Sequence, residues 1–250
     1  MAQFTSQTDD SVIAFSAVSE SGQRATLAIR KGSPFEPQIS AIAIAGGIVA
    51  NEAEAVRADL KPEALTRTIR DSLAKHMPTP YITARDAIVA AKRTNDQRVT
   101  DLEKPPTDPI IATETRTLFR GLSVPDQHHW ARAAGLESLR AIIVPGRAHW
   151  PDLTDDLWQA LTDRMHRLAF VEISGISGRF PKQATIDQPC PVGVDLDAVE
   201  KFADEAMENL RASQSAVEGA ESALSRTIAV VAVAGDMTPA EAFALLNRAA

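Results

Sequence analysis

The clearest pattern in the chain is a long stripe of apolar and small residues near its C-terminal end. Its positions alternate between spacings of three and four residues, which keeps one face of a helix turned toward a partner. The stripe consists of Leu196, Val199, Ala203, Ala206, Leu210, Ser213, Val217, Ala220 and Leu224. It predicts one helix over residues 195–234, about 60 Å long at roughly 1.5 Å per residue. Gly219 interrupts it only weakly, because one glycine costs about 1 kcal/mol relative to alanine.

Further apolar residues flank this stripe and widen it, among them Phe202, Met207, Ile228 and Val230. A wide apolar face is typical of a helix that packs on two sides, as in a bundle or an assembly. We therefore expect the largest side chains of the stripe to contact other helices, and these are Leu196, Val199, Leu210, Val217 and Leu224. After the long helix, Thr238, Pro239 and Glu241 form a capping-box sequence that predicts a short terminal helix over residues 239–248.

The N-terminal part of the chain carries the patterning of strands. Residues 11–18 and 24–30 are runs of β-branched and aliphatic side chains, and in the second run apolar and polar positions alternate. The segment 19–23 between them is a cluster of turn-forming residues, so the pair predicts a β-hairpin. Because a lone hairpin is only marginally stable, we expect residues 39–44 to add a third strand that ends at Gly46 and Gly47.

From Asn51 onward the apolar positions recur with the period of helices. We expect helices over residues 52–60, from Pro62 to a stop at Pro78 and Pro80, from Thr83 to residue 102, and over residues 113–122, 125–134 and 155–170. Residues 139–144 fit a helix or a strand, 171–174 predict a short strand, and 175–194 predict an irregular segment. The fold class is therefore α+β and predominantly helical, with an N-terminal β-hairpin or small sheet, short helices and a long C-terminal helix.

The segment 104–109 is the best candidate for a domain boundary, because Pro105, Pro106 and Pro109 fall within it. Neither a helix interior nor a central strand accepts prolines at this density. We therefore expect an exposed linker between residues 1–104, with the β-hairpin and the first helices, and residues 110–250, with the long helix. A chain of 250 residues also fits one continuous domain.

Composition narrows the class of protein further. Hydrophobic residues make up 44% and charged residues 24% of the chain, which is typical of a folded globular protein. A net charge of −7, with Lys and Arg scattered among Asp and Glu, disfavours nucleic acid as a partner. The single cysteine excludes an intramolecular disulfide and favours a reducing compartment. The N-terminus lacks a signal-peptide pattern, and the weakly polar run 39–50 is shorter than a bilayer requires. We therefore expect a cytoplasmic protein without a membrane segment.

Few residues suggest chemistry. His128, His129 and His149 are near one another in the sequence, but adjacent histidines on a helix point in different directions and lack a metal-binding spacing. Cys190 lies between two prolines, and the sequence assigns no base to it. No stretch matches a phosphate-binding loop or a dinucleotide-binding motif. We therefore expect no metal and no cofactor, and the first alternative is a hydrolase-like enzyme with a dispersed site around these four residues.

The segment from Gln127 to Val144 resembles a helix-turn-helix unit. Gln127 opens its first helix, Ala131 stands four residues later, and Gly135 occupies the turn. A DNA-binding regulator is therefore the second alternative. The exposed face of the second helix would carry an acid, aliphatic residues and Arg140 as its lone cation, where base and phosphate contacts need polar or basic groups. This composition favours a unit that packs against its own chain.

The function that these patterns favour is a non-enzymatic structural or assembly subunit, which acts through helix–helix contacts in an oligomer or a larger complex. The wide stripe on the long helix carries this hypothesis. An Ala- and Arg-rich chain is at home in a high-GC bacterium or its phage, so a virion or phage component is one such complex. The expected partner is protein, either a second copy of the chain or another subunit.

Overall fold

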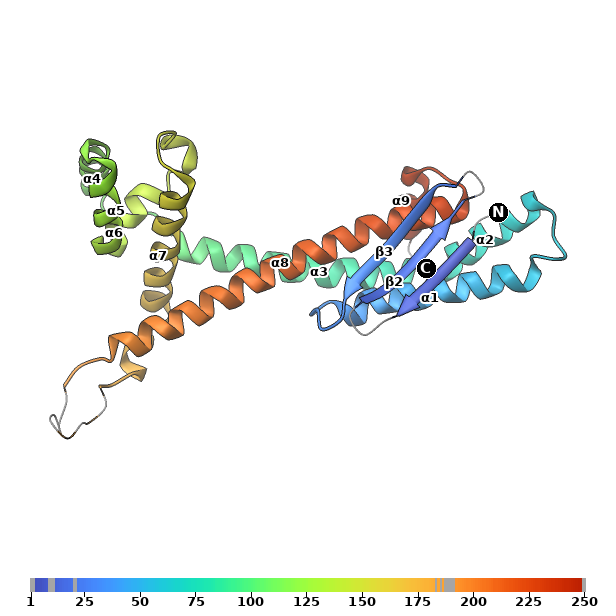
Figure 1. Ribbon diagram of the computed structural model, residues 1–250, viewed down its shortest axis with the longest axis horizontal. Coiled ribbons are helices and arrows are strands. Elements are labelled where there is room, and N and C mark those ends of the chain that lie inside the picture. Colours follow the sequence, from blue (N-terminus) through green and yellow to red (C-terminus); the bar gives the residue numbers. More distant parts are fainter. Residues whose placement is uncertain are drawn as a thin grey trace. The chain divides into compact units, whose positions relative to one another are not determined.

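The computed structural model describes residues 3–8, 12–19, 22–182, 184, 186 and 192–248 (Figure 1). The protein is α+β and mostly helical, with an N-terminal antiparallel sheet, short helices and a long C-terminal helix, as the sequence predicts. Two compact units divide the chain: the first comprises Met1–Thr94 and Ser213–Ala250, and the second comprises Asn95–Ala212. The segment 104–109 lies inside the second unit, and the domain boundary predicted there stays a prediction that limited proteolysis would test.

A three-stranded antiparallel sheet opens the first unit, in the order β1 (Gln3–Thr8), β2 (Val12–Val18) and β3 (Arg24–Arg30). The predicted hairpin is confirmed as β2 and β3, with Phe15 opposite Leu27 and Ile13 opposite Ile29. Because side chains alternate between the faces of a strand, these four lie on one face. They pack with α1 (Glu36–Val56), which lies along the sheet in Figure 1.

Residues 39–44 belong to α1, so the strand predicted there is wrong. The buried positions of α1 recur every three or four residues, and they are Ile39, Ile42, Ala43, Ala45, Gly46, Val49 and Ala53. A short apolar run fits a strand or a buried helix equally well, and only its continuation to Val56 distinguishes the two. Gly46 and Gly47 lie inside this helix, so they do not end a strand as predicted. A Cβ at Gly46 would lie 2.6 Å from the ring of Phe15, so the glycine lets helix and sheet approach closely.

Two helices, α2 (Pro62–His76) and α3 (Pro78–Leu102), follow α1. The predicted helix from Pro62 is confirmed, and its Leu65, Ile69 and Leu73 are buried. The predicted start of the next helix at Thr83 is wrong, because α3 begins at Pro78. Prolines are tolerated in the first turn of a helix, where the backbone N–H groups have no intrahelical partner to lose.

The long helix α8 (Leu196–Gly235) is unbroken over 40 residues, so the predicted long helix is confirmed and Gly219 does not end it. The terminal helix α9 (Pro239–Leu246) has the predicted capping box between Thr238 and Glu241. In the first unit, α8, α3 and the sheet share one buried cluster. Its members include Phe15, Leu27, Tyr81, Ala84, Ile88, Val217, Ala220 and Leu224. The ion pair between Lys92 and Glu221, at 2.7 Å, joins α3 to α8 beside this cluster.

The second unit contains α4 (Pro109–Gly121), α5 (Val124–Ala133), α6 (Leu136–Ile143) and α7 (Asp155–Ser174), with the adjoining ends of α3 and α8. Its main core forms around Phe119, Trp150, Leu157, Leu161 and Met165. Residues 139–143 are helical, which decides between the two forms that their pattern allowed. The strand predicted over residues 171–174 is wrong, because they form the last turn of α7. That helix ends at Gly175, whose φ of 59° is the left-handed conformation that favours glycine at a helix end.

Residues 104–108 are irregular and mostly exposed, as their prolines predict, and Pro109 is the first residue of α4. The segment is tied down at Thr107, whose backbone N–H and hydroxyl both donate to the carboxylate of Glu137, at 2.7 and 2.5 Å. Among the described residues of the predicted irregular segment 175–194 are a short 3-10 helix, Ile176–Arg179, and an antiparallel bridge between Pro181 and Val194.

Candidate functional site

The second unit carries an apolar hollow of about 410 Å³, which we call the α7–α8 groove. Three helices line it: the last turns of α3, the end of α7 and the first half of α8. The lining residues are Arg98, Asp101, Leu102, Phe170, Ile173, Ala206, Met207, Asn209 and Leu210. All of them lie between Asn95 and Ala212, so the groove belongs to one compact unit.

The floor of the groove is the smaller core of the second unit. Leu102, Ala169, Met207 and Leu210 are buried together there, with Val99, Phe170 and Ala206 packed against them. On α8, positions 203, 206, 207 and 210 recur at spacings of three and four, so one helical face supplies both the floor and a wall. The apolar residues that form this core therefore also give the groove a mostly apolar lining.

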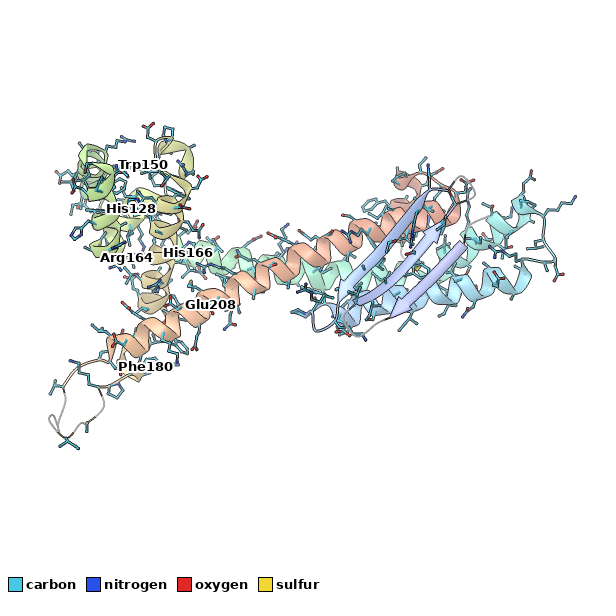
Figure 2. The ribbon with its side chains drawn as sticks, in the orientation of Figure 1. His128, Trp150, Arg164, His166, Phe180 and Glu208 are labelled. Carbon is cyan, nitrogen blue, oxygen red and sulfur yellow. The ribbon has the colours of Figure 1, made fainter. Side chains whose placement is uncertain are left out.

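One large, half-exposed apolar side chain lines the groove, and another lies beside it. Ile173, near the end of α7, keeps 48% of its surface exposed, and Phe202, one turn before Ala206, keeps 40%. The ring of Phe202 lies between those of Phe170 and Phe180, with centroid distances of 6.1 and 5.6 Å. Figure 2 shows Phe180 beside the first turns of α8. These rings extend the apolar surface beyond the hollow itself.

The polar side chains of the groove gather on α3 and on one side of α8. Asp101 accepts a hydrogen bond from the Nε2 of Gln97 at 3.0 Å. Arg98 has no ion-pair or hydrogen-bond partner within the described part of the chain. A mostly apolar pocket with a few polar side chains is typical of a binding site.

Two ion pairs and one histidine–carboxylate contact join the walls of the groove. Arg167 and Arg211 link α7 to α8, because they pair with Asp204 at 2.9 Å and with Asp163 at 2.5 Å. His166 of α7 contacts Glu103 through its Nε2 at 3.0 Å, which ties α7 to the residue just after α3 (Figure 2). Exposed pairs of this kind contribute little each, about 0–1 kcal/mol. The apolar core that the three helices share contributes more to how they meet.

The structure places the five stripe residues in different surroundings. Val199, Leu210, Val217 and Leu224 are buried within the chain, whereas Leu196 is 69% exposed. Leu210 belongs to the core of the groove, and Val217 and Leu224 belong to the core of the first unit. Their predicted contacts with a partner chain stay a prediction. A charge placed at any of the four buried positions would act first on the fold of its own unit.

The residues of the first alternative do not converge in the described part of the chain. His128, His129 and His149 are exposed, and His128 lies on α5, away from Phe180 in Figure 2. Cys190 lies outside the described residues. Among the described residues, no group of three or more His, Cys, Asp or Glu side chains could hold a metal ion.

The helix-turn-helix-like segment forms α5 and α6, joined at Ala134 and Gly135. Its second helix lies against α4 and α7, and five of its eight residues are buried, among them Leu139 and Ile142. Arg140, which the pattern places on an exposed face, is 6% exposed and paired with Glu137 and Glu172. Its guanidinium is therefore held inside the protein, and the expectation of an exposed cation is wrong.

By length and composition α1 could cross a membrane, and α8 with α9 passes the same test as a bent pair among the described helices. The weakly polar run 39–50 thus lies in a helix of 21 residues, which is longer than the run itself suggests. A core helix has the same composition, and α1 buries Ile39, Ile42 and Val49 in the first unit. The cytoplasmic location stays a prediction.

Sequence reasoning identified only one wall of the groove. The apolar residues beside the stripe, Phe202 and Met207, signalled that α8 packs on two sides. Nothing in the sequence paired them with Leu102 or Ile173, because these residues come together only through the packing of α3, α7 and α8. Comparison of the chain with protein-family models, with curated proteins and with solved structures found no match.

Proposed function

We propose that the protein is a non-enzymatic assembly subunit that binds an apolar, helical protein segment in the α7–α8 groove. The observation that carries the proposal is the open hollow lined by the half-exposed Ile173, with the exposed ring of Phe202 beside its lining residue Phe170. Large exposed apolar surfaces rimmed by polar residues are typical of interaction sites. A virion or phage component is one form that such a complex takes.

The shape and chemistry of the groove suit a helix better than a small polar ligand. An amphipathic helix presents apolar side chains at spacings of three, four and seven residues, and it lays that face into an apolar groove. Met207 lines the groove, and the flexible side chain of methionine adapts to the shape of a partner. Because the floor of the groove is already packed as a core, binding would order few further side chains there and would cost little entropy.

This proposal places the contact in the groove and not along the whole stripe of α8. The buried stripe residues already pack inside the chain, so a partner would reach them only by opening a core. The groove, by contrast, exposes apolar surface to a partner while both units stay folded. Helix–helix contact in a larger complex, which the sequence predicts, then acts through the part of α8 that faces the groove.

Site-specific photo-crosslinking in the source cell tests the proposal. A photoreactive phenylalanine analogue in place of Ile173 would lie at the mouth of the groove, and we expect it to form a discrete crosslinked protein species. The matched control carries the same analogue at Ile44, an isoleucine of α1 that is 66% exposed in the first unit. Equal labelling from both positions, or none from Ile173, would count against a binding site in the groove.

A further inference from the structure

We infer that the segment bound in the α7–α8 groove is the exposed face of α4 from a second copy of this chain. The inference rests on the proposed function, because it names the occupant of the same groove. It is carried by the apolar face that α4 leaves uncovered and by the charges on that face and in the groove.

The uncovered face of α4 consists of three aliphatic side chains, which we call the α4 ridge. Ile110, Ile111 and Leu118 expose 70%, 57% and 58% of their surfaces. The opposite face buries Ala112 and Phe119 in the core of the unit, so the ridge cannot turn inward. The carboxylate of Asp108 accepts hydrogen bonds from the backbone N–H groups of Ile110 and Ile111 and fixes the first turn of α4.

One charge stands at the centre of the ridge. Glu114 follows Ile110 by four residues and precedes Leu118 by four, so it shares their face of the helix. Like Arg98 in the groove, Glu114 is exposed and has no partner in the described part of the chain. The unpaired anion of the ridge therefore complements the unpaired Arg98 of the groove, whose own carboxylate, Asp101, is already hydrogen-bonded to Gln97. Complementary charges of this kind fix the register of a contact.

The contact joins two copies because ridge and groove lie on different parts of the second unit. In Figure 1, α4 lies on the other side of α7 from the last turns of α3. A ridge on one copy that meets a groove on the next is a heterologous contact, and such contacts build rings or open chains of subunits. The α4 ridge has a small area compared with a standard interface, in which each partner buries about 800 Å². We therefore expect association that depends on protein concentration.

Charge reversal tests the pairing in the full-length purified chain. Wild-type mass by light scattering should rise with concentration, and Arg98→Glu and Glu114→Arg should each weaken association by about tenfold or more. Mixed in equal amounts, the two variants should associate about as well as the wild type. In the mixture, the groove of one variant meets the α4 ridge of the other variant, and residues 98 and 114 then carry opposite charges. This rescue also shows that both variants are folded, and Ile44→Asp serves as the control that changes nothing.

Two outcomes would overturn the inference. One is a wild-type chain that keeps the mass of a single copy at every concentration, and the other is association that neither reversal weakens. If either is found while Ile173 still crosslinks to a different protein, the groove has another occupant and the proposed function stands. If Ile173 crosslinks to nothing as well, the proposed function fails together with the inference.

Discussion

Arg140 is a buried cation whose partners lie nearer to solvent. Its two Nη atoms donate to Glu137 at 2.7 Å and to Glu172 at 2.8 Å, which ties α6 to α7. Glu137 also accepts both hydrogen bonds of Thr107, so one carboxylate connects the proline-rich segment to α6. An unpaired guanidinium in this position would cost several kcal/mol, and the two carboxylates offset that cost. The spacing of Glu137 and Arg140 on one helix indicates that they pair, but nothing in the sequence brings Thr107 or Glu172 to them.

Glu137 gives this network a dependence on pH. Its hydrogen bonds from Thr107, and then the one from Arg140, lower its pKa from 4.5 to about 2. A carboxylate with a lowered pKa stabilises the fold above its unfolded pKa, and that contribution is lost as pH falls from about 4.5 toward 2. Because nearly half of the side chain is exposed, water screens the interaction. We expect Glu137→Gln to lower the free energy of unfolding by about 1 kcal/mol at neutral pH.

Urea unfolding at several pH values checks this expectation. The difference between wild type and Glu137→Gln should shrink as pH falls below about 4.5, because a protonated Glu137 resembles glutamine. Glu208→Gln is the matched control in the same unit, since Glu208 is exposed and has no partner within the described residues. A difference that stays constant down to low pH would show that the variant acts through packing and not through charge.

At the scale of elements, prolines and caps were more informative than short apolar runs. The prolines at 62 and 239 marked the starts of α2 and α9, and the long period of α8 survived one internal glycine. The run 39–44 fits a strand as well as a helix, because its apolar and alanine residues lack the regularly spaced polar positions that reveal a helical period. The third strand, β1, lies before the hairpin. The groove could not be predicted, because its walls come from three helices that are distant in the sequence.

The two glycines of α1 provide a matched pair for testing how this helix meets the sheet. Gly47→Ala adds a methyl group where nothing lies within 4 Å, so we expect about 0.5–1 kcal/mol of added stability from helix propensity. Gly46→Ala would place its Cβ 2.6 Å from the ring of Phe15, which is buried and cannot swing away. We expect this variant to lose about 1–3 kcal/mol. Thermal unfolding of both variants measures the difference, and equal effects would mean that α1 and the sheet pack less closely than described.

For the whole molecule, the two units have separate cores with different spectroscopic reporters. All three tryptophans, Trp130, Trp150 and Trp158, lie in the second unit, and the single tyrosine, Tyr81, lies in the first. Tryptophan fluorescence therefore reports the unfolding of the second unit alone, whereas circular dichroism reports the helices of both. The helices α3 and α8 each contribute residues to both units, so they are the elements through which the unfolding of one unit would reach the other.

Val217→Asp tests how strongly the two units depend on each other. Val217 is 4% exposed in the core of the first unit, and a carboxylate there should cost at least about 3 kcal/mol. We expect the helical signal of the first unit to melt at a lower temperature while the tryptophan transition keeps its midpoint. The control is Ser215→Asp, which places the same charge on an exposed position of the same helix. If both signals shift together in Val217→Asp, the loss passes through the helices that the units share and the chain unfolds as one cooperative body.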